Sequence, residues 1–74
     1  MTAKQASKIV RNAMRIMQWS RPKVADYLRV SVSATEKWDR AEERRHDVRR
    51  ATEARLVMLQ SRYLDVTVPG GGTR

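Results

Sequence analysis

Apolar side chains recur along residues 3–18 with the spacing of a single helical face. They are Ala6, Val10, Ala13, Met14 and Met17. Their positions follow the i, i+4, i+7, i+8, i+11 spacing of one face of an α-helix. Basic side chains repeat at similar spacing on the opposite face, given about 100° of rotation per residue; they are Lys4, Lys8, Arg11 and Arg15. The pattern predicts a first helix with one packed face and one basic face. We expect this basic face to be a solvated surface rather than a binding surface.

Residues 20–42 read as two short helices joined by a tight turn. Ser20 is a good N-cap, and Pro22 falls in the first turn, where a missing N–H costs nothing. The packing face of this helix is Val24, Ala25 and Leu28. Ser31 is a second N-cap, so the next helix starts at Val32 and runs to about Ala41, with Trp38 directed to the core. Residues 41–47 are very polar and predict a loop or a frayed helix end.

The last part of the chain predicts a fourth helix over residues 47–63. One of its faces carries Val48, Thr52, Leu56, Leu59 and Tyr63. A second apolar set, on roughly the opposite side, consists of Val57 and Leu64 with Ala54 nearby. Contact with another subunit is one explanation, with scattered exposed side chains the other. Val66, in the segment that follows, is a further candidate for a dimer interface. Residues 64–68 alternate between apolar and polar, which predicts either a short strand or a disordered tail. We therefore divide the chain into a domain over 1–66 and a flexible tail over 67–74.

Composition narrows the classes of function. The 74 residues hold 16 Lys+Arg against 8 Asp+Glu, a formal net charge of +8, and the first acid along the chain is Asp26. Twelve of the sixteen cations are arginine, whose planar fork suits phosphates and guanine edges. There is no cysteine and only one histidine, His46. We therefore expect no metal site and no cofactor. We also expect that the protein is not an enzyme, with no catalytic residues and no small-molecule substrate. Short apolar runs predict no membrane partner, and we expect a cytoplasmic, nucleoid-associated protein.

The helix predicted from Val32 has one side free of packing residues. Val32, Ser33, Glu36 and Lys37 share the side away from Ala34, Thr35 and Trp38. This side begins at the N-terminus of the helix, which is the end that enters the major groove in helix-turn-helix proteins.

The segment resembles the helix-turn-helix of the Cro-type phage repressors, the lambda-repressor-like DNA-binding domains. The matching residues are Ser20, Arg21, Ala25, Leu28-Arg29-Val30-Ser31 and Trp38-Asp39-Arg40-Ala41, about a third of the chain. Arg29 stands where the family usually has a left-handed glycine, at a cost of about 1 kcal/mol. Thr35 replaces a half-buried Ile or Val, and Ala41 replaces the glycine that ends the helix, which predicts a helix that runs on further.

The resemblance implies an all-α, four-helix domain that binds double-stranded DNA, and it implies the following roles. Val32, Ser33, Glu36 and Lys37 would meet base edges: Lys37 would donate to guanine, Val32 would touch a thymine methyl, and Glu36 would accept from cytosine or repel. Arg21 would grip a phosphate. First-turn amides after Ser20 and Ser31 would add to that grip, and Arg40 and Arg44 are candidate backbone clamps.

Two main functions compete. The first is a phage or plasmid transcriptional repressor that binds a palindromic operator as a homodimer, with two recognition helices about 34 Å apart. The second is a small protein-interaction module, such as a phage-encoded inhibitor of a host protein. An RNA-binding protein ranks lower, because the sequence offers no exposed aromatic residues in a basic sheet. A steep fall of affinity with salt and an enriched symmetric DNA site would favour the first function.

Overall fold

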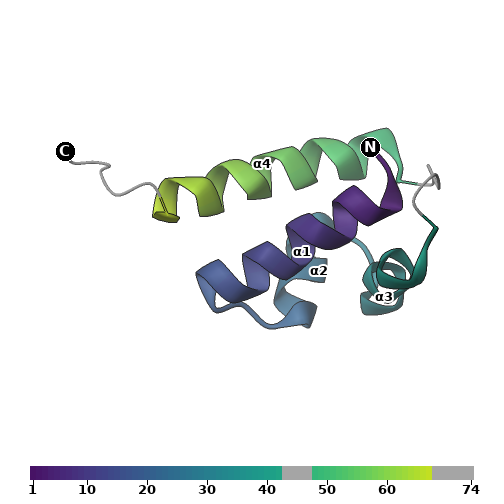
Figure 1. The fold of residues 1–74 in the computed structure, drawn as a ribbon, viewed down its shortest axis with the longest axis horizontal. Helices are drawn as coiled ribbons and strands as arrows, with labels where there is room; N and C mark the ends of the chain where they lie inside the picture. Colours follow the sequence, from purple (N-terminus) through teal and green to yellow (C-terminus); the bar gives the residue numbers. More distant parts are fainter. Residues whose placement is uncertain (43–47, 68–74) are drawn as a thin grey trace.

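The computed structural model describes residues 1–42 and 48–67, which form four helices. The helices are α1 (Ala3–Met17), α2 (Arg21–Leu28), α3 (Val32–Arg40) and α4 (Arg50–Thr67). In Figure 1, α1 and α4 lie side by side and run in the same direction. Helix α2 contacts both of them, and α3 packs against α1 and α2. The all-α, four-helix class predicted from the sequence is confirmed. Within the described residues, none of the helices combines the length and apolar character needed to cross a membrane.

Helix α1 forms the centre of the fold because it packs against each of the other three helices. The expected face is buried at Ala6, Val10 and Ala13, and the burial extends to Ile9, which the sequence pattern missed. The predicted range was correct to within one residue at the C-terminal end. A capping box, also missed, starts the helix: Thr2 Oγ1 accepts from the amide of Gln5 at 3.1 Å. The Gln5 side chain in turn accepts from the Thr2 amide at 2.8 Å.

Helix α4 covers the core with the predicted face. Leu56 and Leu59 are fully buried, Thr52 and Tyr63 nearly so, and Val48 packs against the core from just before the helix. One polar contact joins α4 to the N-terminal residue, and another joins it to α1. The N-terminal ammonium group of Met1 lies 2.9 Å from Oε1 of Glu53, and the Asn12 amide donates to the Tyr63 hydroxyl at 3.4 Å.

The bounds of α4 differ from the prediction at both ends. The helix begins at Arg50 rather than at residue 47, and it continues through residues 64–67, so the predicted strand was wrong there. A strand needs a partner for its backbone groups, whereas a continued helix satisfies them within its own chain. Five alternating residues are too few to distinguish the two-residue period of a strand from the 3.6-residue period of a helix. Residues 43–47 and 68–74, which include Asp47 and most of the expected tail, lie outside the described residues.

Candidate DNA-binding surface

The turn between α2 and α3 is built by local backbone geometry. Ser20 caps α2, and its hydroxyl accepts from the Lys23 amide at 3.3 Å. Arg29 ends α2 in the left-handed region, with φ 59° and ψ 43°. The amides of Arg29 and Val30 then bond back to the carbonyls of Asp26 and Ala25, at 3.1 and 3.0 Å, the Schellman arrangement that reverses a chain after a helix. The left-handed residue expected at position 29 is thus present, with arginine in place of glycine.

Helix α3 begins where the sequence predicts. The Ser31 hydroxyl accepts from the Ala34 amide at 3.1 Å and caps the first turn. The helix ends at Arg40, because Ala41 takes an extended conformation with φ −72° and ψ 151°. The expectation that α3 would run on past Ala41 was therefore wrong. An extended backbone can end a helix without a left-handed glycine, so the loss of glycine at this position does not lengthen α3.

One face of α3 is fixed to the body of the protein. Trp38 is 6% exposed and Thr35 is fully buried, although positions like Thr35 are half buried in the family it resembles. Ala25 of α2 is also buried, which lets the two short helices approach closely. The Thr35 hydroxyl donates to the Val32 carbonyl at 2.7 Å, so burial leaves its polar group satisfied.

The opposite face of α3 is open to solvent. Ser33, Glu36 and Lys37 are exposed, and Arg40 is exposed on the same face, one turn after Lys37. Val32 is half buried at the edge of this face. None of these side chains makes an ion pair within the part of the chain that the structure describes. The candidate base-contacting residues therefore present free polar and cationic groups along one side of a rigidly held helix.

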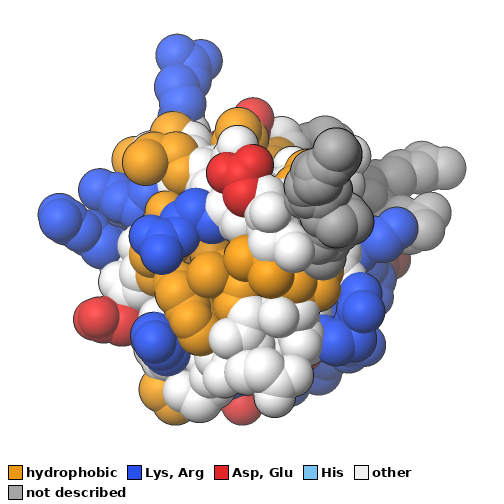
Figure 2. Space-filling model, turned by 90° about the vertical axis from the view of Figure 1, so that its left-hand side faces the viewer, with side chains coloured by type: hydrophobic (Ala, Val, Ile, Leu, Met, Phe, Trp, Pro, Cys, Tyr) orange, Lys and Arg blue, Asp and Glu red, His pale blue; other side chains and the backbone are white. Residues whose placement is uncertain are grey.

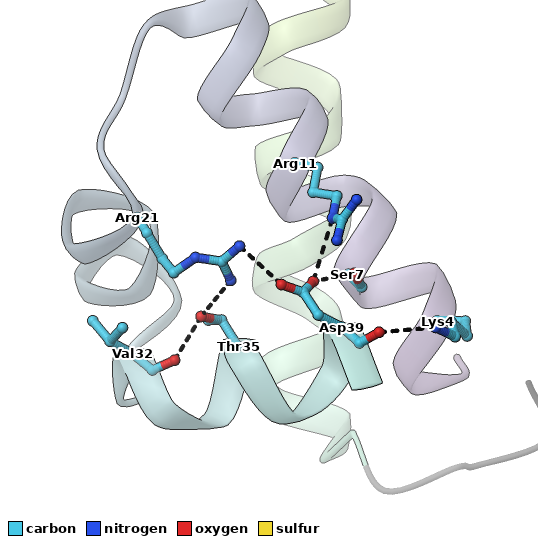
Figure 3. Close-up of polar contacts among 7 residues, drawn as sticks. All are labelled: Lys4, Ser7, Arg11, Arg21, Val32, Thr35 and Asp39. Carbon is cyan, nitrogen blue, oxygen red and sulfur yellow. Dashed lines mark hydrogen bonds and ion pairs between the residues drawn. The ribbon is translucent and has the colours of Figure 1, made fainter. Parts of the chain in front are cut away.

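Asp39 anchors α3 to both α1 and α2, a role that the sequence analysis did not predict (Figure 3). Its carboxylate accepts a hydrogen bond from the Ser7 hydroxyl of α1. It also lies 2.9 Å from Nη2 of Arg21 and 3.5 Å from Nε of Arg11. The Asp39 carbonyl accepts from the Lys4 ammonium group at 2.9 Å. Because the donors lie up to 35 residues away along the chain, only the tertiary structure brings these groups together.

The surroundings of Asp39 favour its ionised form. Burial of the carboxylate disfavours the charge, but the hydrogen bond from Ser7 and the charges of Arg21 and Arg11 outweigh it. Together they hold the pKa of Asp39 below its ordinary value. The carboxylate therefore stays charged at neutral pH and holds the last turn of α3 in place.

The candidate phosphate-contacting residues have different surroundings. Ser20 and Ser31 are exposed at the starts of α2 and α3 and serve as N-caps. Arg40 is exposed, and Arg44 lies outside the described residues. Arg21 is held within the molecule: its side chain is 20% exposed, and Nη1 donates to the Thr35 hydroxyl at 3.0 Å while Nη2 pairs with Asp39. These contacts connect Arg21 to α3 in the folded chain.

Two further arginines flank α3 and were missed as candidates. Arg29 from the turn and Arg49 from just before α4 line one shallow hollow of about 280 Å³, together with Ala34 and Trp38 of α3. Both arginines are exposed. The two arginines lie together because residues at the start of α4 lie beside the turn between α2 and α3. Neighbouring residues in the sequence do not predict this arrangement.

The aromatic residues pack rather than stand free for base stacking. Figure 2 views the end of the molecule at which α1 and α4 finish, where apolar side chains gather with Lys and Arg around them. The rings of Trp19 and Tyr27, 5.7 Å apart between centroids, pack against the core. The Lys23 ammonium group lies 4.7 Å from the Trp19 ring centroid, and the Arg62 guanidinium 5.7 Å from it. Cation–π contacts thus tie these cations to the fold.

The candidate dimer residues of α4 are all exposed. Val57 is 51%, Leu64 47% and Val66 61% exposed, and Ala54 is exposed as well. They do not share one face: Val66 lies nine residues after Val57, which is about 180° around the helix. Val57, Leu64 and Ala54 therefore form one group, and Val66 lies on another side.

Comparison with protein families, with curated proteins and with solved structures finds no match to this chain. The likeness to Cro-type repressors thus depends on the residues of the helix-turn-helix alone.

Proposed function

We propose that the protein binds double-stranded DNA sequence-specifically by inserting α3 into the major groove, as a transcriptional regulator of the repressor type. The observation that carries the proposal is the two-sided character of α3. One side is buried at Thr35 and Trp38 and anchored through Asp39, and the other exposes Ser33, Glu36 and Lys37. A rigid helix with free polar groups at its leading end suits the reading of base edges.

The exposed groups suggest roles for each residue in this proposal. Lys37 donates to O6 and N7 of guanine, and Ser33 bonds to a neighbouring base. Val32, half buried at the edge of the face, contacts a thymine methyl group through the part of it that is exposed. Glu36 accepts from a cytosine amine and repels sequences that place an acceptor there.

Phosphate contacts come from the cations that surround this face. Arg40 follows Lys37 on the same side of α3, and Arg29 and Arg49 flank the helix. Arg21 acts as a positioning residue in this proposal, because both terminal nitrogens of its guanidinium already bind groups on α3. A surface with this excess of positive charge makes affinity fall steeply with salt concentration.

Selection of bound duplexes from a random pool tests the proposal, followed by affinity measurements on the enriched site. Lys37→Ala should weaken binding to that site by about 5- to 150-fold, the value of one good base contact. The matched control is Lys8→Ala, which removes the same charge from an exposed position on α1. That variant should weaken specific and non-specific DNA alike, and only slightly.

Two results would contradict the proposal. One is a pool that shows no enrichment, and the other is an enriched site that Lys37→Ala binds as tightly as the wild type does. Arg21→Ala separates the two roles considered for that residue. A contact to phosphate predicts a salt slope flatter by about one unit, whereas a positioning role predicts an unchanged slope and a less stable protein.

The alternative function is that of a protein-interaction module, favoured by the exposed apolar residues Val57 and Leu64 on α4. In that case DNA affinity would be weak, without sequence preference and independent of Ser33 and Lys37. The same selection experiment therefore separates the two functions.

A further inference from the structure

The outer face of α4 carries a repeating pattern of exposed residues. Arg50, Ala54, Val57, Ser61 and Leu64 follow one another at alternating spacings of four and three residues. All five are exposed, and at about 100° per residue they form one narrow stripe along the helix. Helices pack side by side along stripes at these spacings when the residues are mostly apolar, and here Ala54, Val57 and Leu64 are apolar. We call these five residues the α4 seam.

One charge at each end of α4 has the wrong sign for the helix dipole, although Glu53 in the first turn has the favourable sign and pairs with the N-terminal ammonium group. Arg50 is the first residue of the helix and Asp65 lies in its last turn, and both are exposed. A cation at a helix N-terminus and an anion at a helix C-terminus are each unfavourable, because the dipole carries the same sign there. Neither residue forms an ion pair with another residue that the structure describes. They are about 22 Å apart along the axis, too far to pair with each other.

We propose that a second copy of this chain docks on the α4 seam in antiparallel orientation, forming a two-fold symmetric dimer. With the partner reversed, the Arg50 side chain of each copy reaches the last turn of the other helix, where Asp65 and the negative dipole end lie. Both unfavourable charges gain a partner of opposite sign in this arrangement. A two-fold axis produces the pair twice, since each copy offers the same surface.

Residue sizes along the seam fit a register in which Arg50 lies about 4.5 Å along the axis from Asp65 of the second copy, a distance that a long arginine side chain can span. When the two-fold axis crosses the helices midway between Val57 and Ser61, Val57 lies opposite Ser61 of the second copy. Ala54 then lies opposite Leu64 of the second copy, so each larger side chain meets a smaller one. Alternation of large and small side chains lets facing helices interdigitate closely. Met58, which is 60% exposed, borders the seam and would cover its edge.

A parallel pair would not satisfy these features. It would place Arg50 beside Arg50 and Asp65 beside Asp65, and it would set leucine against leucine and alanine against alanine. Like charges at close range are destabilising. The orientation of the partner is therefore decided by the charge order and by the size order together. The inferred dimer goes beyond DNA binding and is measured without DNA.

Sedimentation equilibrium across protein concentration tests the proposal. The wild type should show a monomer–dimer equilibrium, and Val57→Glu should raise its dissociation constant about tenfold or more, because a carboxylate enters the seam. Val66→Glu is the matched control, since Val66 is an exposed valine of the same helix on the opposite side. Its dissociation constant should stay within about twofold of the wild-type value. Circular dichroism checks whether both variants remain folded.

A charge exchange tests the orientation. Arg50→Glu and Asp65→Arg should each weaken the dimer, and the double variant should recover affinity, because the antiparallel pair is restored with its signs reversed.

A second measurement uses the absence of cysteine in the chain. Ala54→Cys mixed with Leu64→Cys should cross-link the two copies on oxidation, whereas Ala54→Cys alone should not. A wild type that stays monomeric would overturn the proposal, as would a double variant without recovery or cross-linking by Ala54→Cys alone. None of these outcomes bears on whether α3 reads DNA.

Discussion

Asp39→Asn should destabilise the protein strongly, although Asp39 lies at the end of a short helix. The substitution keeps the shape of the side chain and removes its charge. The Arg21 side chain, 20% exposed, then loses its anionic partner at 2.9 Å. Charge-assisted hydrogen bonds of this kind contribute about 1.5–3 kcal/mol.

The other contacts of Asp39 add less to this loss. The asparagine amide oxygen can still accept from the Ser7 hydroxyl, and Arg11 is 66% exposed, so that pair contributes little. We therefore expect a loss of about 2–3 kcal/mol in the free energy of unfolding. A domain of 74 residues has roughly 4–11 kcal/mol in total, so the melting temperature should fall by roughly 10–20 °C.

Urea unfolding followed by tryptophan fluorescence, with Asp26→Asn as control, measures this effect. Asp26 is an exposed carboxylate of α2 that forms no ion pair with any residue the structure describes, so its variant should stay within about 0.5 kcal/mol of the wild type. Equal losses in the two variants would refute the importance of the anchor.

The pH dependence gives a second criterion with a definite sign. The pKa of Asp39 is lowered in the folded state, so near pH 4 the unfolded chain binds more protons than the folded one. The stabilisation is therefore present above about pH 4 and is lost as the pH falls through the folded pKa. The difference in stability between wild type and Asp39→Asn should shrink on acidification below about pH 4. A difference that stays constant to pH 2 would contradict the assignment of the lowered pKa to this network.

Three further predictions concern α3 and the turn that leads into it. Ser31→Ala removes the cap of α3 and should cost about 1 kcal/mol of stability by urea unfolding, while Ser33→Ala at the next exposed position should cost far less. Arg29→Gly relieves a left-handed arginine and should raise stability by up to about 1 kcal/mol, yet weaken DNA binding at low salt because a flanking cation is lost; unchanged stability would show that the turn is not strained. Glu36→Gln removes the acid from the exposed face of α3 and should tighten binding to non-specific duplexes, measured by fluorescence anisotropy, because one repulsion with phosphate disappears. Unaltered non-specific affinity would place Glu36 away from the DNA.

Helix periodicity and caps made most of the fold predictable from the sequence. Ser20 and Ser31 marked the starts of α2 and α3 to the residue, and the left-handed conformation at Arg29 followed from the resemblance to a helix-turn-helix. These signals are local, because a cap and a helical turn involve groups within about four residues of each other. The exposed side of α3 was predicted for the same reason, since its angular position depends only on where the helix begins.

The contacts that hold this surface in place were decided by the tertiary structure. The sequence matched Asp39 to the end of the helix-turn-helix but predicted no contact for it, and it became an anchor only when α1 placed Ser7 and Arg11 beside it and α2 supplied Arg21. Arg21 matched a phosphate-contacting position, yet the fold directs its guanidinium to Thr35 and Asp39. The sequence also left open where α4 ends. Residues 64–68 alternate as a strand does, but in the structure α4 continues through residue 67. By itself, the sequence determined where the helices begin and which face of α3 is polar, because both depend on neighbouring residues. Which charges are held within the molecule and which remain free depends on groups tens of residues apart, and only the packed structure sets those distances.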